Sequence, residues 1–418
     1  MNILFLADNF PPERNAQALR VFERARYWVE WGHATSVLTC APNFPEGRVY
    51  PGYKNRWRQQ EWMANIRVVR VKTLIAANQG TVIRILDFLS YMVSAFFVGI
   101  FQPRPDVVAA TSPQFFAAVA ALAIARVKRV PFVMEVADLW PQAVVAVGAM
   151  KQSFGLRMVE KLELYMYRKA TAIVALTPAF KASLVARGVP ESKVTVVLNG
   201  VDLSRLRPQP RSAQLAAELG IEEGDFVVAY LGTLGMAHGL GNVLDCAAMV
   251  DDPRIRFLFV GPGAERERLV EAASRRGLRN VIFVPPQPRE RMPEFWSISD
   301  VALVHLRDTP MLHNVIPSKI FEAMGMGRPI LLAAPEGEAS SIIVRENAGL
   351  WVRSGDARAL ADAVSLLKNN AQLMRRLAEA SAAAAPRYTR ERQAREVLQC
   401  LSRAADRGVK AEVCVSGG

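Results

Sequence analysis

The stretch Phe226-Val-Val-Ala-Tyr-Leu-Gly-Thr-Leu-Gly-Met-Ala-His-Gly239 joins six apolar residues to a glycine-rich turn. A continuous apolar run of this length predicts a strand that is buried on both faces, as in a parallel sheet. A glycine turn between such a strand and a helix lets backbone N–H groups approach phosphate oxygens. The stretch therefore predicts an α/β unit with an anion-binding turn, and a tight turn without a ligand is the alternative.

Apolar strand-like runs alternate with helix-length amphipathic runs on both sides of this stretch, which predicts an α/β fold with doubly wound parallel sheets. The alternation breaks at residues 199–210, where a polar segment contains Pro208 and Pro210. We therefore predict two Rossmann-like domains, at 1–200 and 210–385, and a C-terminal helix at about 389–407 that returns to the first domain. The predicted strands are 2–7, 35–39, 67–71, 106–110, 132–136, 172–175, 194–197, 226–231, 256–260, 281–284, 301–304, 329–333 and 350–352.

The charge of the chain is unevenly distributed. The 418 residues are 51% hydrophobic and 22% charged, as in a globular protein, with a net charge of +13. Residues 1–205 hold 25 Lys/Arg against 14 Asp/Glu, whereas residues 206–418 hold 27 against 25. The basic half predicts an anionic partner such as a membrane surface or a phosphorylated substrate. It has no strand platform of interleaved aromatics, so we expect no nucleic-acid partner.

Two very apolar helices are expected in the basic half, at 83–101 and 113–129. The longest uninterrupted apolar stretch in the first has 14 residues, and a membrane span needs about 20. The first helix is therefore expected to be a core helix or an in-plane helix at a membrane surface, with a true span as the remaining alternative. Two such helices inside the basic half favour docking on an anionic bilayer. An ordinary buried α/β layer with a basic rim is the alternative to membrane docking.

The motifs of several enzyme classes are missing. The four cysteines are scattered and the N-terminus begins as a strand rather than a signal peptide, which favours the cytoplasm. No G-x-G-x-x-G follows the first strand, and no P-loop or G-x-S-x-G elbow occurs. No D-x-D pair occurs, and the four histidines lack ligand spacing. We therefore expect neither a metal ion nor a bound cofactor.

A second informative segment, 313–329, runs from a loop through a short helix to the next strand. Pro317 suits the first helical turn, where the N–H groups of Ser318 and Lys319 would point outward. Lys319 adds a positive charge, and Glu322, one turn on, offers two acceptor oxygens for ribose hydroxyls. An amphipathic helix with a solvated Lys and Glu is the alternative.

Three strings together resemble one family: Gly-Thr-Leu-Gly-Met-Ala-His-Gly at 232–239, Ile-Pro-Ser-Lys-Ile-Phe-Glu at 316–322, and Asp-Leu-Trp-Pro at 138–141. They are similar to the retaining GT-B glycosyltransferases of family four, and within these to the WbuB-like branch. That branch builds O-antigen and capsule chains and includes N-acetyl-L-fucosamine transferases. The resemblance implies a GT-B fold, with two Rossmann-like domains that face each other across a cleft.

The chain departs from the family pattern at three positions. The family has a pair of Glu eight apart, and here Asn314 replaces the first while Glu322 is the second. The usual cations of the glycine loop are replaced by Thr233 and His238. We therefore assign more of the diphosphate charge to Lys319.

The resemblance implies that the second domain binds the sugar donor. Glu322 would hold the ribose, Ser318 and Lys319 with the 232–235 turn would hold the diphosphate, and 286–289 would line the base. The implied donor-binding residues are Gly232, Thr233, Gly235, His238, Arg289, Asn314, Pro317, Ser318, Lys319 and Glu322.

The same resemblance places the acceptor on the first domain, next to Arg14, Asn15, Glu135 and Asp138. Asp138 would position or deprotonate the acceptor, or stabilise oxocarbenium charge, and with Lys319 and Glu322 it forms the expected catalytic set. An N-cap role for Asp138 and a surface N-terminal turn at residues 14–15 are the alternatives.

The expected reaction is therefore a metal-independent transfer with retained configuration. The sugar would come from a UDP-linked, N-acetylated or 6-deoxy-N-acetylated hexosamine, such as N-acetyl-L-fucosamine. It would go to a lipid-linked glycan in lipopolysaccharide, O-antigen or capsule synthesis, at the inner face of the cytoplasmic membrane. The alternatives are an enzyme like the UDP-N-acetylglucosamine 2-epimerases, which share the GT-B fold, and a non-catalytic nucleotide-sugar-binding subunit of a polysaccharide assembly complex.

Overall fold

The structure is a computed structural model that describes residues 1–13, 15–44, 46–75, 81–112, 115–139 and 154–416. It divides into two compact units: Met1–Leu198 with Arg390–Gly418, and Asn199–Thr389. By sequence, the first unit holds 30 Lys/Arg against 17 Asp/Glu, and the second holds 22 of each. The first unit therefore carries the entire net charge of the chain.

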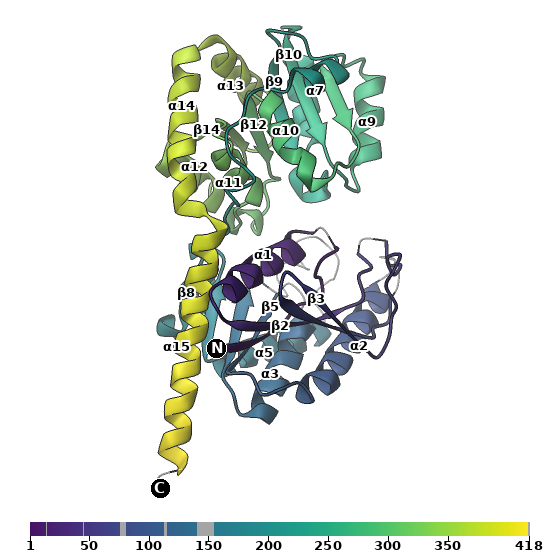
Figure 1. Ribbon diagram of the computed structural model, residues 1–418. Helices are drawn as coiled ribbons and strands as arrows, with labels where there is room; N and C mark the ends of the chain where they lie inside the picture. The colour runs from purple at the N-terminus through teal and green to yellow at the C-terminus, as the bar shows by residue number, and fades with distance from the viewer. Residues whose placement is uncertain (14, 45, 76–80, 113–114, 140–153, 417–418) are drawn as a thin grey trace. The chain divides into compact units, whose positions relative to one another are not determined.

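The first unit is built on an eight-stranded sheet in the order β3-β4-β2-β1-β5-β6-β7-β8 (Figure 1). All neighbours are parallel except β3, which pairs antiparallel with β4 at the edge. The strands are β1 (Asn2–Leu6), β2 (Ala34–Cys40), β3 (Arg58–Met63), β4 (Ile66–Val71), β5 (Val107–Thr111), β6 (Phe132–Val136), β7 (Ala172–Ala175) and β8 (Val194–Val196).

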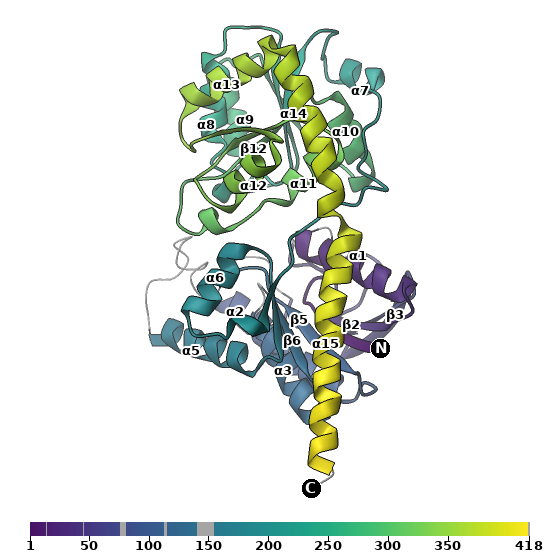
Figure 2. The ribbon, with the colours of Figure 1, turned by 90° about the vertical axis from the view of Figure 1, so that its left-hand side faces the viewer.

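Helices cover both faces of this sheet. One face is packed by α1 and α15, through Val21, Trp28, Val397 and Leu401 (Figures 1 and 2). The indole N–H of Trp28 donates to the Ala394 carbonyl at 2.9 Å, so the C-terminal helix is part of this unit. The helices are α1 (Ala16–Glu30), α2 (Thr81–Ile100), α3 (Phe115–Lys128), α5 (Phe154–Lys169), α6 (Pro178–Ala186), the 3-10 turn η1 (Glu191–Lys193) and α15 (Arg390–Ser416).

The two apolar helices α2 and α3 on the opposite face differ in exposure. Along α3, Phe115, Leu122 and Ile124 are buried, so this helix is part of the core. In α2, Tyr91 and Val98 are buried but other apolar side chains remain exposed. Of the two alternatives, the buried α/β layer therefore holds for α3, because α3 packs against both α2 and the sheet. Among the described residues, no helix combines the length and apolarity needed to cross a membrane.

The second unit is built on a six-stranded parallel sheet in the order β11-β10-β9-β12-β13-β14. Its strands are β9 (Phe226–Leu231), β10 (Ile255–Val260), β11 (Val281–Val284), β12 (Val301–His305), β13 (Ile330–Ala333) and β14 (Gly349–Val352). Its helices are α7 (Ala213–Glu218), η2 (Met236–His238), α8 (Gly241–Met249), α9 (Arg266–Arg275), η3 (Arg289–Arg291), α10 (Met292–Ile298), η4 (Leu312–Asn314), α11 (Ser318–Gly325), α12 (Glu338–Glu346), α13 (Ala357–Asn369), α14 (Ala371–Ala384) and η5 (Ala385–Tyr388).

The predicted fold class is confirmed, because each unit is a doubly wound α/β layer. The thirteen predicted strands all occur with ends that shift by at most one residue. The one additional strand in the described ranges is β3, whose residues Arg-Gln-Gln-Glu-Trp-Met are exposed or half-buried. The prediction missed β3 because a polar edge strand lacks the continuous apolar run of a central strand.

Candidate functional site

The strand order of the second unit defines one switch point, at the carboxyl ends of its central strands β9 and β12. From β9 the chain continues to β10 and β11 on one side, and it then returns to β12 on the other side of β9. The connections after β9 and β12 therefore diverge, and this switch point is where open α/β sheets bind ligands. The glycine turn follows β9, and the loop to α11 follows β12.

Gly261 and Gly263, which follow β10, pack closely against the backbone of the glycine turn. A Cβ at Gly261 would lie 2.2 Å from the Gly232 carbonyl oxygen, and a Cβ at Gly263 would lie 2.2 Å from that of Leu234. The Leu234 N–H donates to the Pro262 carbonyl at 2.7 Å. The turn is therefore held by residues 260–263 after β10, which the sequence analysis did not single out.

Lys319 is the most unusual side chain at this end of the sheet. It is only 8% exposed, and its Nζ has no hydrogen-bond partner within the described part of the chain. The Nζ lies 3.5 Å from the centroid of the Tyr230 ring and 3.2 Å from the place of a Cβ on Gly232. Burial lowers the pKa of Lys319 to about 7, against an opposing effect of Glu322. A buried cation without a hydrogen-bonded counter-anion, beside a glycine turn, is suited to an anionic ligand.

The N-terminus of α11 adds further donors to this position. Pro317 is its N-cap, and no side chain of the described residues caps the helix there. The first-turn N–H groups of Ser318 and Lys319 therefore add the positive end of the helix dipole. Glu322 lies one turn further along and is half-buried. The structure thus brings Gly232, Lys319 and the start of α11 together at the carboxyl end of the sheet, as the donor-site prediction requires.

Tyr230, which the sequence analysis missed, links the turn to Lys319. Its hydroxyl donates to the Thr233 carbonyl at 2.8 Å, and the Lys319 ammonium makes a cation–π contact with its ring. The ring is fully buried at the end of β9. Its place directly before the glycine turn is the one signal in the sequence that points to it.

Two substitutions of Tyr230, one that removes its hydrogen bond and one that also removes its ring, should weaken the donor kinetics by different amounts. Tyr230→Phe keeps the ring and removes one hydrogen bond, so we expect the KM for the donor to rise by about 2- to 10-fold. Tyr230→Leu also removes the cation–π contact, which is worth about 2 kcal/mol when desolvated, and we expect a further loss of roughly 30-fold. Steady-state kinetics with both variants measures this difference; equal losses would show that the ring does not support Lys319.

The histidines of the site are neutral at pH 7. Burial, with a smaller effect of Lys319, lowers the pKa of His238 to about 4. Its Nδ1 lies 3.3 Å from the His305 carbonyl, so this nitrogen donates and Nε2 is left as an acceptor. A ring in this tautomer neither carries charge nor donates to a phosphate from Nε2. Of His238, His305 and Lys319, only Lys319 therefore brings positive charge to the turn.

His305 holds the far end of the same turn. Its Nδ1 donates to the His238 carbonyl at 2.6 Å, and its Nε2 lies 2.9 Å from the Asn242 side-chain amide. Burial lowers the pKa of His305 to about 4, so its Nε2 is an acceptor and the NH2 group of Asn242 must face it. His305 is a positioning residue for the turn.

The remaining predicted donor residues lie on the connections around the switch point. Asn314 is the last residue of η4, before α11, and a Cβ on Gly337 would lie 2.1 Å from the His313 carbonyl beside it. Arg289 begins η3 after β11, two strands away from β9. Thr233 and Gly235 lie within the turn itself. Their contacts with a donor remain predictions.

The predicted acceptor residues belong to the first unit. Arg14 lies outside the described residues, as do Trp140 and Pro141 of the Asp-Leu-Trp-Pro string. Asn15 is the N-cap of α1: its side chain accepts the Ala18 N–H at 2.8 Å and donates to Asn9 Oδ1 at 2.5 Å. This side chain is therefore engaged in capping the helix.

Glu135 and Asp138 differ in their surroundings. Glu135 is buried between Arg20 and Arg24 and accepts from Thr111 at 2.8 Å; burial would raise its pKa, but the two arginines lower it to about 2. Its carboxylate is engaged within the protein, which favours a positioning role. Burial raises the pKa of Asp138 to about 6, with an opposing effect of Arg20. Asp138 is thus the better placed of the two to exchange a proton with an acceptor hydroxyl.

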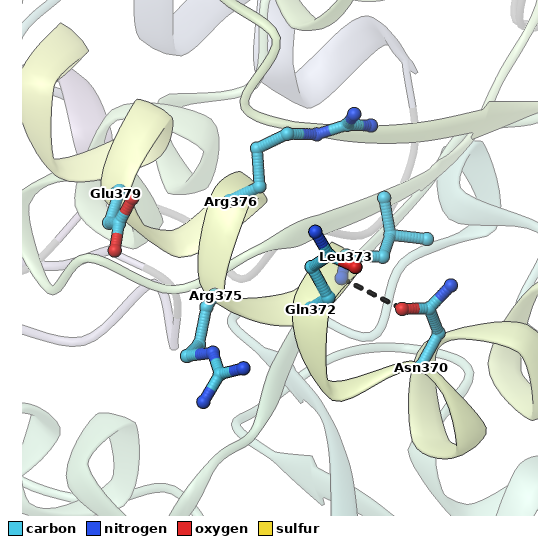
Figure 3. Close-up of a pocket in the computed structure, with 6 residues that line it drawn as sticks. All are labelled: Asn370, Gln372, Leu373, Arg375, Arg376 and Glu379. Carbon is cyan, nitrogen blue, oxygen red and sulfur yellow. Dashed lines mark hydrogen bonds between the residues drawn. The ribbon is translucent and has the colours of Figure 1, made fainter.

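A separate hollow of about 510 Å³ lies around the start of α14 (Figure 3). Arg375 and Arg376 point in different directions there, and Asn370 Oδ1 accepts the Leu373 N–H at 2.9 Å. It shares no residue with the predicted donor site. Its charged groups do not converge, so it is not a second candidate site.

Comparisons with known proteins agree with this geometry. The family model described as glycosyl transferases group 1 matches residues 212–384, and the model described as glycosyltransferase family 4 matches residues 17–205. The chain is a glycosyltransferase of the group 1 type with the GT-B fold. The two models match the second and the first unit respectively.

Individual proteins similar to this glycosyltransferase share the same general activity or fold. An Escherichia coli protein described as a colanic acid biosynthesis glycosyl transferase, WcaI, is 24% identical over 80% of this chain and 83% of its own length. Sucrose-phosphate synthase from Thermosynechococcus elongatus superposes with a TM-score of 0.77, at 16% identity over 96% of this chain and 98% of its own. Anabaena HepE in complex with UDP-glucose superposes with a TM-score of 0.72, at 18% identity over 96% of this chain and 100% of its own. At these identities the two solved structures show the fold alone.

Proposed function

We propose that this glycosyltransferase moves a hexosyl group from a UDP-sugar to a lipid-linked glycan, with retained anomeric configuration. The observation that carries the donor assignment is Lys319, a buried cation beside the glycine turn at the sheet's switch point. UDP as the nucleotide is supported by HepE, whose structure holds UDP-glucose. Polysaccharide synthesis is supported by WcaI, which is described by its role in colanic acid biosynthesis.

In the proposed reaction, the bond between the anomeric carbon and the diphosphate oxygen breaks, and its electron pair leaves with the diphosphate. Lys319 and the N–H groups of Ser318 and of the 232–235 turn stabilise that charge. The acceptor hydroxyl oxygen forms the new bond to the anomeric carbon, and Asp138 positions this hydroxyl, whose proton passes to Asp138 or to the leaving diphosphate. A 6-deoxy-N-acetylated hexosamine, such as N-acetyl-L-fucosamine, is the sugar we propose from the motif resemblance.

A lipid-linked acceptor also implies a location in the cell for the proposed reaction. A glycan on an isoprenoid or lipid A anchor is presented at the cytoplasmic leaflet, whose anionic lipids attract basic proteins. The first unit carries the whole net charge of +13. We therefore propose peripheral association with the inner face of the cytoplasmic membrane.

The decisive test is UDP release measured with and without a lipid-linked acceptor. We expect slow release with the donor alone and a large increase with the acceptor, accompanied by a product enlarged by one sugar. Conversion of the free sugar nucleotide without acceptor would support the epimerase alternative instead. Thermal protection by one UDP-sugar with no turnover on any lipid-linked acceptor would support the non-catalytic subunit. A panel of UDP-sugars, tested for thermal protection, identifies the donor.

Activity should survive EDTA. The diphosphate is proposed to be held by Lys319 and backbone N–H groups, which supply positive charge without a divalent cation. We expect the initial rate in an excess of EDTA to match the untreated rate. Loss of activity that Mg²⁺ or Mn²⁺ restores would contradict this proposal.

A further inference from the structure

The exposed face of α2 forms an apolar stripe. Ile83, Leu86, Val93 and Phe97 of α2, and Phe101 directly after its end, are all exposed. At 100° per residue these five positions fall within one arc of about 80°. Tyr91, Ala95 and Val98 occupy the opposite arc and are buried against the sheet and α3. The helix thus carries apolar side chains on both sides, and the described residues of its unit cover only one of them.

The edge strand β3 extends this stripe at the C-terminal end of α2. Trp62, which is 65% exposed, is the cross-strand partner of Arg67, so both side chains lie on the same face of the sheet. The Arg67 guanidinium donates to Gln102, directly after Phe101, at 2.9 Å. Trp62 therefore lies on the α2 face of the sheet, near the exposed Phe101.

A second contact extends the stripe at the N-terminal half of α2. The Leu74 N–H donates to Ser90 Oγ at 2.7 Å, and the Leu74 side chain is exposed. Thr73, next to Leu74, is joined to Asn55 by two hydrogen bonds, of 2.7 and 3.0 Å, and the exposed Trp57 follows Asn55 by two residues in the chain. We call the full set the α2 belt: Trp57, Trp62, Leu74, Ile83, Leu86, Val93, Phe97 and Phe101.

Basic side chains accompany the α2 belt. Lys54, Arg56, Arg58 and Lys72 are all exposed and lie on the same segments as Trp57, Trp62 and Leu74. Glu61 is paired with Arg70 on the other face of β3. A helix with an exposed apolar face, flanked by tryptophans and cations, has the chemistry of an in-plane element at an anionic membrane interface.

We propose that the α2 belt is the surface that docks on an anionic lipid bilayer, with Phe97 and Phe101 inserted and Trp57 and Trp62 at the headgroup level. The choice of a membrane rather than a second protein copy rests on the proposed lipid-linked acceptor and on the flanking cations. Insertion of apolar side chains contributes binding free energy that salt does not screen. The flanking cations contribute electrostatic binding free energy, which salt does screen.

The test uses the full-length protein with vesicles of phosphatidylglycerol and phosphatidylcholine. We expect Phe97→Glu with Phe101→Glu to weaken co-sedimentation by roughly 10- to 100-fold, because both changes place a charge in the inserted layer. The matched control is Val344→Glu with Leu366→Glu, which places the same charges on exposed apolar positions of the second unit and should bind like the wild type. Equal binding of the double variant and the wild type would overturn the proposal.

Tryptophan fluorescence tests the same surface without a disruptive substitution. Brominated acyl chains should quench the wild type, and Trp57→Phe with Trp62→Phe should remove at least half of that quenching. Unchanged quenching would contradict the assignment of these side chains. A wild-type dimer that Phe97→Glu with Phe101→Glu dissociates, without vesicle binding by either protein, would show that the belt joins two copies instead. Thermal protection by a UDP-sugar measures donor binding by the second unit. Failure of the glycosyltransfer proposal is therefore distinguished from failure of the membrane-docking proposal.

Discussion

Lys319→Met should abolish most of the donor-dependent activity while making the free protein more stable. The ammonium is the one cation assigned to the diphosphate, and loss of one preorganised donor costs roughly 100- to 1000-fold in rate. In the free protein the same ammonium is buried without a hydrogen-bond partner in the described residues, and methionine fills a similar volume without that cost. We expect kcat/KM for the donor to fall by this factor and Tm to rise by a few degrees.

The stability of the free protein should also depend on pH through Lys319. Its pKa is lowered from 10.5 to about 7, so between these values the unfolded chain holds a proton that the folded site has lost. The free energy of unfolding therefore rises as the pH increases from about 7 to 10.5, and this contribution disappears in Lys319→Met. Donor binding should show the reverse trend, because a diphosphate needs the protonated amine: donor affinity falls above pH 7.

The control for both measurements is Lys161→Met, which removes an exposed lysine on α5 of the first unit. It should leave the donor kinetics and the pH profile unchanged. A Lys319→Met protein that melts lower than the wild type and still binds UDP-sugar normally would show that Lys319 is a structural residue.

Glu322→Gln should weaken UDP-sugar binding by roughly 10- to 150-fold and leave the KM for the acceptor unchanged. A carboxylate that accepts from ribose hydroxyls loses a charge-assisted hydrogen bond of about 1.5–3 kcal/mol when it becomes an amide. Isothermal titration with the donor and steady-state kinetics with varied acceptor measure the two effects separately.

Glu322 also acts on Lys319, and pH separates the two roles. Its charge opposes the lowering of the Lys319 pKa, so the Gln variant should lose the Lys319 proton at a lower pH. If ribose binding is lost, the weakened affinity of the variant persists when the pH is lowered from 7 to 6, which favours the protonated form of Lys319. Recovery of wild-type affinity at pH 6 would assign the whole effect to Lys319 and remove Glu322 from the ribose.

Much of the candidate donor site could be predicted because its parts are short and local. The 232–239 turn and the 316–322 segment each place their donors through backbone geometry, which depends on Gly, Pro and Ser at fixed offsets. Tyr230, His305, Gly261 and Gly263 could not be found in this way, since each acts through a neighbouring strand or loop that is distant in sequence.

The apolar helices show the limit of composition as a guide. Residues 83–101 and 113–129 look alike in sequence, yet α3 is buried and α2 keeps the exposed face of Val93 and Phe97. Composition sets how apolar a helix is, whereas its exposure depends on which elements pack beside it. Both helices pack on the sheet, but α3 has α2 and α5 as neighbours and contacts three strands, whereas α2 lies over β2 and β4 and packs mainly against α3.

The amino-acid sequence by itself determined the strands, the doubly wound class and the segments that carry the phosphate-binding backbone. Continuous apolar runs and glycine turns act over a few residues, so they are visible in any sequence. Only the tertiary structure decided that Lys319 is buried against the Tyr230 ring, that Glu135 is paired with Arg20 and Arg24, and that apolar side chains on one face of α2 are exposed. Burial and pairing arise from contacts between residues far apart in the chain, and those contacts set the charge state of each side chain.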